Sequence, residues 1–523
     1  MEEQKINQKI KTAYEHAAPE DARTAVSAAA AEGTKRRNKK RARLRFILSA
    51  AAVLAVVAGV GIYQMYGKQI LFSLNMAGVN LSDYVLAAAE YPETSDEYSV
   101  TGNELEEDKA QRLANQENYP EYYDEFALST LRMILASGED TENIAYSPIS
   151  LYMTLAMLAE TTDGDSRAQI LEALGAEDTK DTGTLRTQAQ ALWMGNYIST
   201  RKTTSILASS IWLNEDLDFI QSTLDTLASG YCTSTYRGDL ASSDCQNAIL
   251  KWLNENTGNM LADLDDSAAS QRKKLEMDAD TAAALFSTIY FDVEWSKKFE
   301  EEDTEEGEFQ TADGTVTCDF MNQTIKNQDY WKAEQFSAIF KGFSGTGGGM
   351  WLILPDEGVS VYDLLEDEVL AAMLTDGYTW SNGHGSIDWK LQLDLELEAD
   401  QMIVNLSMPK FDISSELDLT DTLTALGVTD VFDERLADFS ALTGAAAGSD
   451  DSAYLSRVQQ TIRVEVNEEG VRAAAYTEAD LTSLGSAPSQ TDEIDFVLDR
   501  PFLFVAVSDT GTMLFAGVVN QPQ

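Results

Sequence analysis

The chain has 523 residues and a formal net charge of −49, which argues against a nucleic-acid partner because phosphate backbones require clustered Lys and Arg. With 44% hydrophobic residues, it can bury a large core and is not disordered as a whole. It has two histidines (His16 and His384) and three scattered cysteines (Cys232, Cys245 and Cys318), so we expect no metal site, cofactor, disulfide framework or histidine-dependent nucleophile.

The N-terminal segment has a charge opposite to that of the remaining chain. Twelve of the 38 Lys and Arg and six of the 87 Asp and Glu lie in residues 1–45, giving +6 there and −55 elsewhere. The run from Phe46 to Tyr66 contains no charge, and at about 1.5 Å per residue it can span a hydrocarbon core of roughly 30 Å. The basic flank predicts a single-pass membrane anchor with residues 1–45 as a cytoplasmic tail. A cleaved signal peptide is the alternative, since Ala-x-Ala patterns occur within the apolar run.

Residues 67–118 follow the predicted anchor. They are acidic, contain Pro and Gly, and show no sustained hydrophobic period, which predicts a mobile linker. The globular domain is expected to occupy residues 119–523, outside the cell. The long basic tail, the anchor and the acidic exterior favour a bacterial cell surface.

Hydrophobic periodicity then predicts both helices and strands in the domain. A short buried strand is expected within 143–150, followed by a helix through Leu158. The other expected helices are 126–135, 166–175 and 245–261, and the expected strands lie at 205–215, 280–295, 351–358, 402–414 and 500–520. Helices dominate the first half and strands the second, so the sequence predicts an α+β class.

The most informative segment is residues 454–501. A strand-like stretch reaches the turn Asn467-Glu468-Glu469-Gly470, after which small or apolar side chains alternate with polar or bulky ones. This period of two is typical of a strand with one buried face, yet residues 483–489 have the composition of an exposed loop. The segment can therefore occupy either a loop or a sheet. Its inward-facing set is Val471, Ala473, Ala475, Thr477, Ala479 and Leu481.

Several collinear motifs in residues 119–523 resemble the serpin family of serine protease inhibitors. The motifs are Asn143-Ile144 with Ser147-Pro148-Ile149-Ser150; Phe291, Trp295 and Phe299 followed by 308–323; Pro409-Lys410-Phe411 with 426–444; Val464 to Gly470 with Ala473-Ala474-Ala475; Asp499 to Phe504; and Phe515, Gly517 and Asn520. Each motif alone is weak, but their joint order makes the resemblance specific.

The resemblance implies a serpin fold with three β-sheets, about eight or nine helices and an exposed reactive loop. It implies a suicide-substrate inhibitor, not an enzyme, that acts as a monomer on extracellular serine proteases, with cysteine proteases left open as targets. The cleaved loop would insert into the central sheet and trap the acyl-enzyme. The alternative is a non-inhibitory serpin-like surface binding protein.

The resemblance also implies particular site residues. Family spacing from Gly470 places the reactive bond at Leu484-Gly485, and the leucine favours chymotrypsin-, subtilisin- or elastase-like targets. The expected hinge is Glu468, Glu469, Gly470, Val471, Ala473, Ala474 and Ala475. The expected sheet-opening region is Ser147, Ser150, Ser287 and Gln460, and the expected group at the top of the sheet is Lys410, Glu468 and Trp295.

The chain departs from the family pattern at four positions in or beside these groups. The family often has Thr or Ser at the position of Val471 and Glu at the position of Arg472. We expect Arg472 to face outward on insertion. Ser287 and Gln460 replace a common Asn and His, and these two departures bear on the insertion rate more than on the fold. Lys410 and Glu468 are expected within contact distance of each other.

Overall fold

The computed structural model describes most of the serpin-like region. The described residues are 79–89, 91, 110, 112–136, 141–176, 182–199, 203–257, 275, 277, 281–344, 348–375, 378–381, 384–387, 398–449, 453–455, 458–471 and 492–522. Among them, no helix is both long enough and apolar enough to cross a membrane. The predicted anchor, residues 46–66, lies outside the described residues.

The chain order of the elements mixes helices with strands, as the α+β class requires. The described α-helices are α5 (Tyr123–Ala136), α6 (Pro148–Thr161), α7 (Gly164–Ala173), α8 (Thr182–Asn196), α9 (Gln221–Tyr231), α10 (Ser243–Glu255), α12 (Glu368–Thr375), α14 (Thr420–Ala425) and α15 (Ser440–Thr443). The strands are β1 (Val85–Ala87), β2 (Ile144–Tyr146), β3 (Ile198–Ser199), β4 (Thr203–Asn214), β5 (Thr233–Gly238), β6 (Ala283–Glu294), β7 (Thr304–Thr311), β8 (Gly314–Lys332), β9 (Phe336–Gly342), β10 (Gly349–Pro355), β11 (Tyr378–Ser381), β12 (His384–Ile387), β13 (Glu398–Pro409), β14 (Phe411–Asp418), β15 (Gln459–Val466), β16 (Gly470–Val471), β17 (Glu493–Val497), β18 (Phe502–Val507) and β19 (Met513–Val519).

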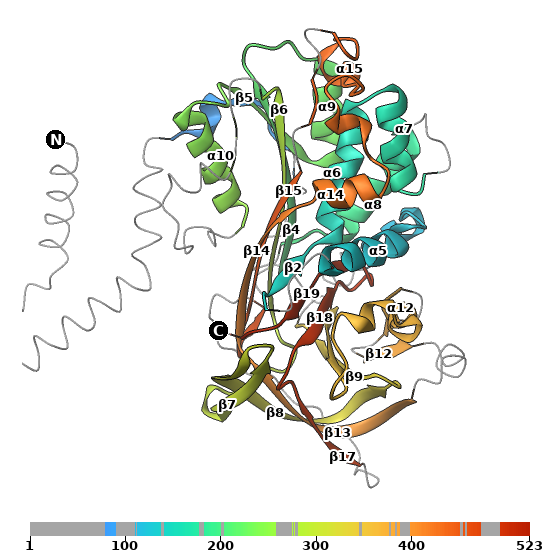
Figure 1. Cartoon of the computed structure of the whole chain (residues 1–523), viewed down its shortest axis with the longest axis vertical. Coiled ribbons are helices and arrows are strands. Elements are labelled where there is room, and N and C mark those ends of the chain that lie inside the picture. The colour runs from blue at the N-terminus through green and yellow to red at the C-terminus, as the bar shows by residue number, and fades with distance from the viewer. Residues whose placement is uncertain are drawn as a thin grey trace, which may run out of the picture. The chain divides into compact units, whose positions relative to one another are not determined.

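A long eight-stranded sheet forms the centre of the domain (Figure 1). Its order is β1-β5-β4-β6-β16-β15-β14, with β3 paired to β4. Strand β16 has only two residues, and it is antiparallel to both β6 and β15. The two long strands are therefore bridged at one end by a short strand. This bridge positions the candidate site.

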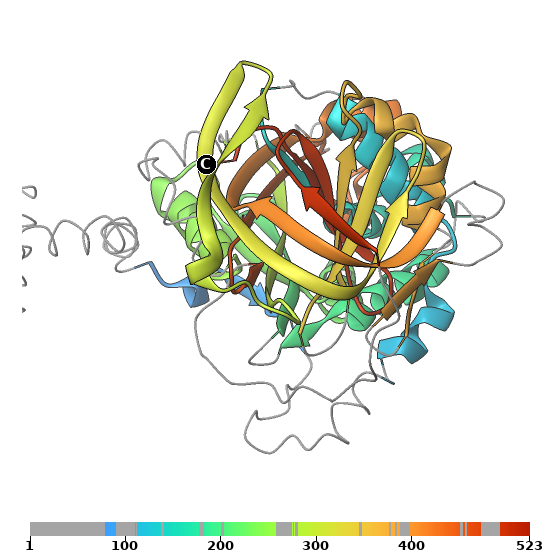
Figure 2. The ribbon, with the colours of Figure 1, turned by 90° about the horizontal axis from the view of Figure 1, so that it is seen from below.

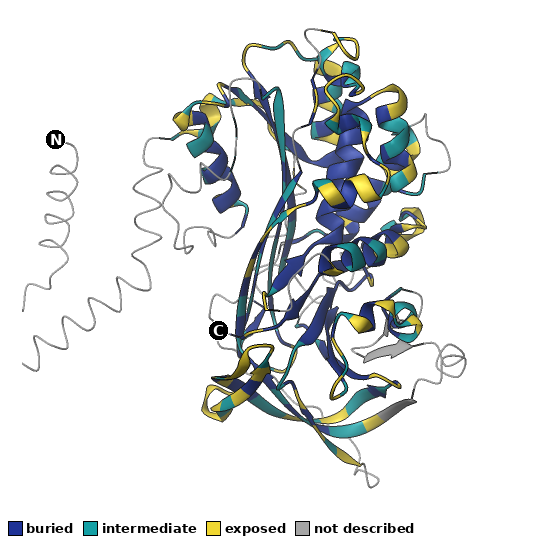
Figure 3. Ribbon diagram, viewed as in Figure 1, coloured by how far each residue is buried: buried dark blue, intermediate teal, exposed yellow. Residues whose placement is uncertain are grey.

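Helices cover both faces of this sheet: α6 lies on one side and α10 on the other (Figure 1). Every residue of α6 is buried, which gives the uniformly dark blue helix of Figure 3. Ser147 caps the helix by accepting a hydrogen bond from the Ser150 amide, and Pro148 occupies the first turn, where its missing N–H costs nothing. On the opposite face, α10 packs through Trp252 against Trp212 and Phe286.

The remaining described strands form two further sheets. The larger has the order β17-β13-β8-β9-β10-β18-β19-β2, with β7 paired to β8. Figure 2 shows it from below, with the long strand β8 in yellow and β13 in orange. The smaller sheet is the hairpin of β11 and β12.

The predicted helices at 126–135 and 166–175 appear as α5 and α7, and the strands at 205–215 and 280–295 appear as β4 and β6. The strand and helix predicted within 143–158 appear as β2 and α6. The helix predicted over 245–261 corresponds to α10, which ends at Glu255.

Residues 79–91 were expected within the mobile linker, but the described ones pack on the edge of the central sheet. We call this segment the strap. Val85 pairs with Tyr236 of β5, and the Tyr84 ring lies 6.3 Å from that of Trp212. Gly238 provides the space, since a Cβ there would lie 2.9 Å from the Tyr84 ring. At the other end of the strap, the Tyr91 ring stacks on that of Tyr197 at 6.0 Å and lies tilted against that of Trp193 in α8 at 5.8 Å.

Candidate functional site

The predicted hinge turn joins β15 to β16. The Asn467 side-chain oxygen accepts hydrogen bonds from the Glu469 and Gly470 amides at 3.0 and 3.3 Å, which closes the turn locally. Gly470 approaches β6 so closely that a Cβ would lie 2.0 Å from the carbonyl oxygen of Val293. Only glycine fits at this position.

The segment that follows β6 holds the turn by its backbone carbonyls. The Trp295 indole donates to the Asn467 carbonyl at 3.0 Å, and the Trp295 amide donates to the Glu469 carbonyl at 2.9 Å. The Phe299 amide donates to the Glu468 carbonyl at 3.1 Å. We call residues 295–299 the hinge clamp. The side chain of Trp295 is fully buried.

Ion pairs add to the clamp, and the expected contact between Lys410 and Glu468 is present. Lys410 Nζ lies 2.6 Å from Glu468 Oε1, to which the Thr304 hydroxyl also donates at 2.8 Å. Partial burial of Glu468 opposes ionisation, but hydrogen bonds from Lys410, its own backbone and Thr304 outweigh burial and lower its pKa. Lys298 forms a second pair with Glu469 at 2.5 Å.

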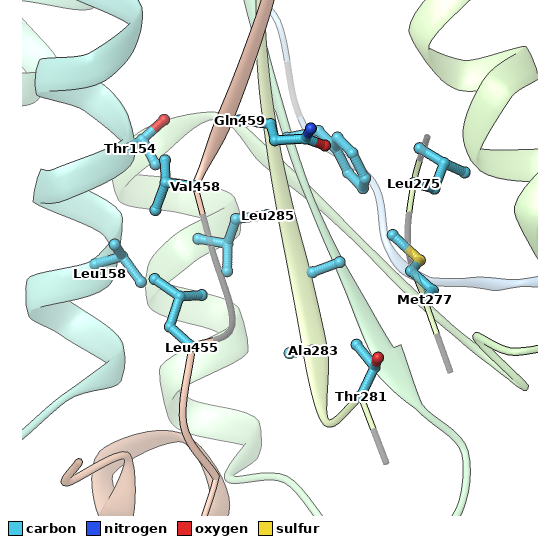
Figure 4. Close-up of a pocket in the computed structure, with 12 residues that line it drawn as sticks. Thr154, Leu158, Leu275, Met277, Thr281, Ala283, Leu285, Leu455, Val458 and Gln459 are labelled. Carbon is cyan, nitrogen blue, oxygen red and sulfur yellow. The ribbon is translucent and has the colours of Figure 1, made fainter. Parts of the chain in front are cut away.

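Two small cavities lie along β6 and β15, below the bridge made by β16. The upper one, about 10 Å³, is lined by Ile289, Phe291, Ile462, Arg463, Val464, Glu465, Val471 and Phe515. The lower one, about 40 Å³, is lined by Thr154, Leu158, Leu275, Met277, Thr281, Ala283, Ala284, Leu285, Phe286, Leu455, Val458 and Gln459 (Figure 4). Both cavities border the same two strands, and the helix α6 contributes Thr154 and Leu158 to the lower one.

Between the cavities, the predicted sheet-opening residues meet at the start of α6. Gln460 accepts from the Ser147 amide at 2.8 Å and donates to the Ser147 carbonyl at 2.9 Å. The Ser147 hydroxyl contacts that of Ser150 at 3.0 Å and donates to the Leu514 carbonyl. Ser287 lies on β6, opposite β4, and among the described residues no hydrogen bond joins it to Gln460. The structure thus brings Ser147, Ser150 and Gln460 together.

Five predicted site residues lie outside the described residues. These are the hinge alanines Ala473, Ala474 and Ala475 and the predicted reactive bond Leu484-Gly485. Their roles stay predictions.

Sequence reasoning missed two contributors to the site. Phe299 was part of a family-like motif, but the motif did not show that its backbone amide donates a hydrogen bond to the Glu468 carbonyl. The hydrogen bond from Thr304 to Glu468 also had no local signal, because 164 positions separate the two residues.

At this site, a short strand continues from a clamped turn and pairs with two long strands, one on each side. The family profile of serpins, the serine protease inhibitors, matches residues 121–522. The chain belongs to the serpin family.

Individual relatives and solved structures agree with this assignment. Plasminogen activator inhibitor 1 of Sus scrofa is 29% identical over 412 residues, covering 76% of this chain and 91% of the relative. Serpin-ZX of Arabidopsis thaliana is 25% identical, covering 76% and 96%. The native state of the thermophilic serpin tengpin superposes with a TM-score of 0.62 at 24% identity, covering 84% of this chain and 99% of tengpin. This structural likeness concerns the fold.

These relationships bear on the general class of activity. They support a serine protease inhibitor and not an enzyme. The predicted serpin fold, with mixed sheets and many helices, is confirmed.

Proposed function

We propose that the protein is a suicide-substrate inhibitor of extracellular serine proteases that inserts its cleaved loop between β6 and β15. The target would attack the Leu484-Gly485 bond and form an acyl-enzyme, after which the loop enters the sheet; serpins are a known case of such insertion. Leu484 in the specificity pocket favours chymotrypsin-, subtilisin- or elastase-like targets. No basic residue lies between Arg472 and Arg500, which argues against a trypsin-like target.

The register of β16 is the observation that carries this proposal. Val471 pairs with Val293 of β6 and with Val466 of β15, so its side chain shares their inner face. If the following residues continue in this register, the small alanines face the upper cavity. Ala473 would lie between Phe291 and Val464, and Ala475 between Ile289 and Ile462.

In this register, the inserted side chains would match their neighbours on β6 and β15 in polarity as well as in size. Thr477, the one polar member of the inward-facing set, would lie between Ser287 and Gln460. In this register, the cross-strand partners above and below this level are apolar. Ala479 would come next, between Leu285 and Val458 at the lower cavity. A register shifted by one residue would instead turn polar and bulky side chains inward.

A binding function is the second candidate. The fold also occurs in thyroxine-binding globulin in complex with thyroxine, with a TM-score of 0.59 at 21% identity, covering 77% of this chain and 98% of that one. However, the two cavities described above have volumes of about 10 and 40 Å³. Small-molecule sites usually have roughly 300–1,000 Å³. These cavities suit added side chains better than a separate ligand.

Incubation with subtilisin or pancreatic elastase tests inhibition directly. We expect an SDS-stable complex and a sharp rise in Tm for the cleaved protein, whereas simple digestion without either would contradict the proposal. Ala475→Glu should convert the inhibitor into a substrate, because the carboxylate would be buried between Ile289 and Ile462 without a partner. Tyr476→Glu is the matched control, since the next residue would face outward and trapping should persist.

We further propose that the protein is a monomer held at a bacterial cell surface by the run from Phe46 to Tyr66, with the serpin domain outside. The charge-free run and its basic flank support this topology. N-terminal sequencing of the mature protein distinguishes an anchor from a signal peptide, since cleavage after an Ala-x-Ala site would remove the tail and the span. A variant lacking residues 1–34 should be exported and should inhibit as the full chain does.

A further inference from the structure

A buried lysine lies directly behind the hinge clamp. Lys341 of β9 is 3% exposed, and its ammonium donates to the Lys297 carbonyl at 2.9 Å and to the Gln323 side-chain oxygen at 2.8 Å. It also lies over two aromatic rings, 4.2 Å from the Phe299 centroid and 5.1 Å from that of Trp295. Among the described residues, no carboxylate forms an ion pair with it.

These contacts link Lys341 to the hinge through the clamp. Three of its four partners belong to residues 295–299, and this same segment donates hydrogen bonds to three successive carbonyls of the turn. A positive charge strengthens both kinds of contact, because cation–π attraction requires it and charge-assisted hydrogen bonds are stronger than neutral ones. The charged form of Lys341 should therefore hold the rings and the Lys297 carbonyl more firmly than the neutral amine.

Burial without a carboxylate partner disfavours that charge. Desolvation, reinforced by the nearby positive charge of Lys297, lowers the pKa of Lys341 to about 7. The contacts with the hinge clamp thus favour the charged form of Lys341, whereas its burial favours the neutral form.

Among the other charged groups around the hinge, Glu468 and Lys298 have pKa values shifted away from neutrality, and Lys297 has one shifted towards it. Glu468 has a lowered pKa, and the Lys298 pKa is raised, chiefly by its hydrogen bonds to Glu469 and Glu294, which outweigh desolvation. The pKa of Lys297 is lowered by desolvation and by Lys326. The chain has only two histidines, and neither lies on the segments that form the hinge and its clamp.

We propose that Lys341 is a positioning residue for loop insertion, whose protonation tightens the hinge clamp and makes insertion depend on pH near neutrality. The proposal rests on the proposed inhibitory function. In acid, the charged side chain holds the turn and retards the entry of the strand beyond Val471. Above neutrality, the clamp loosens and insertion accelerates.

Stoichiometry of inhibition between pH 6 and 8.5 tests the functional part of this proposal. The ratio of wild type to Lys341→Met at each pH cancels the pH dependence of the protease itself. We expect this ratio to fall at least threefold as the pH rises through 7, whereas a constant ratio would overturn the proposal. Lys341→Arg, which stays charged, should keep the behaviour of the acid form at every pH.

Lys332→Met is the matched control. Lys332 lies on the neighbouring strand β8, and its ammonium is paired with Asp356 at 2.6 Å, so its loss should leave the profile unchanged. A pH dependence abolished equally by both variants would contradict a specific role for Lys341.

A measurement without protease separates this proposal from the inhibitory function. Between the folded pKa near 7 and the ordinary lysine pKa of 10.5, the unfolded chain binds the extra proton, so Lys341 should make the folded state more stable as the pH rises. In the wild type, unfolding stability should rise with pH from about 7 upward and tryptophan emission should change around pH 7, and Lys341→Met should lack this pH-dependent component in both. If this component is present but the protein inhibits no protease, the proposed inhibitory function is wrong and the titration of Lys341 is still supported. If the component is absent, the proposal for Lys341 is wrong.

Discussion

Arg472 offers a sharp test of the register of insertion, because the serpin family often has Glu at this position. In the register of β16, Arg472 would lie on the outer face, between Asp292 of β6 and Glu465 of β15. Two carboxylates therefore flank the place where this chain carries an arginine. We predict that Arg472→Glu, although it introduces the residue common in the family, impairs this inhibitor.

The size of the effect follows from the two cross-strand pairs. A directly opposite pair of unlike charges stabilises a sheet by roughly 0.2–1 kcal/mol, and like charges destabilise by similar amounts. Arg472→Glu removes two attractive pairs and creates two repulsive ones, a change of about 2 kcal/mol. If the whole change adds to the free-energy barrier to insertion, the insertion rate falls by about 30-fold, at 1.36 kcal/mol per factor of ten.

Slower insertion gives the protease time to hydrolyse the acyl-enzyme, so the assay is the stoichiometry of inhibition with subtilisin. We expect more inhibitor to be cleaved per trapped protease in Arg472→Glu, and a smaller defect at high salt, where exposed charges are screened. Adding Glu465→Arg should restore trapping. An unchanged stoichiometry, or a defect that persists equally in the double variant and at high salt, would refute the register.

Three further predictions concern the stability of the uncleaved protein. Gln460→Leu leaves the buried amide of Ser147 without a partner and its carbonyl with only the Leu151 amide, so denaturant unfolding should show a loss of about 1–3 kcal/mol; an unchanged midpoint would contradict this role. Because the pKa of Glu468 is lowered, its stabilisation is present above the unfolded value of about 4.5 and is lost as pH falls, so Glu468→Gln should flatten the acid limb of a Tm–pH profile. Tyr84→Ala should raise amide hydrogen exchange in residues 85–87, whereas Tyr454→Ala, at a ring 48% exposed, should not; equal exchange in both would count against the strap.

The sequence predicted those parts of the hinge that depend on local pattern or on a family motif. The turn at Asn467 requires a short-range side-chain contact and a glycine, and both are visible in the chain. The contact between Lys410 and Glu468 followed from the alignment of two motifs. Local pattern could not reveal Lys341, because a single lysine in an apolar strand does not disclose what lies over its ammonium.

The strap escaped prediction for a related reason. Its aromatic residues occur in a stretch without a clear period, and its pairing partner Tyr236 lies about 150 positions further along the chain. Sheet pairing at such a separation has no local signature. The space left by Gly238, which admits the Tyr84 ring, becomes visible only when the two segments are brought together.

The strap also sets how far the inhibitor can reach if Phe46 to Tyr66 is the anchor that we propose. A linker of 52 residues, 67–118, would at full extension carry the domain about 180 Å from the bilayer. The strap begins at Val79, so only 12 residues, 67–78, separate it from the proposed anchor, and at full extension they would span about 40 Å. Confinement to a thinner layer raises the effective concentration of the loop for proteases that act at the cell surface. Proteases further from the bilayer would lie beyond its reach. Inserting residues before Val79 would widen this zone, whereas inserting them after Tyr91 would not.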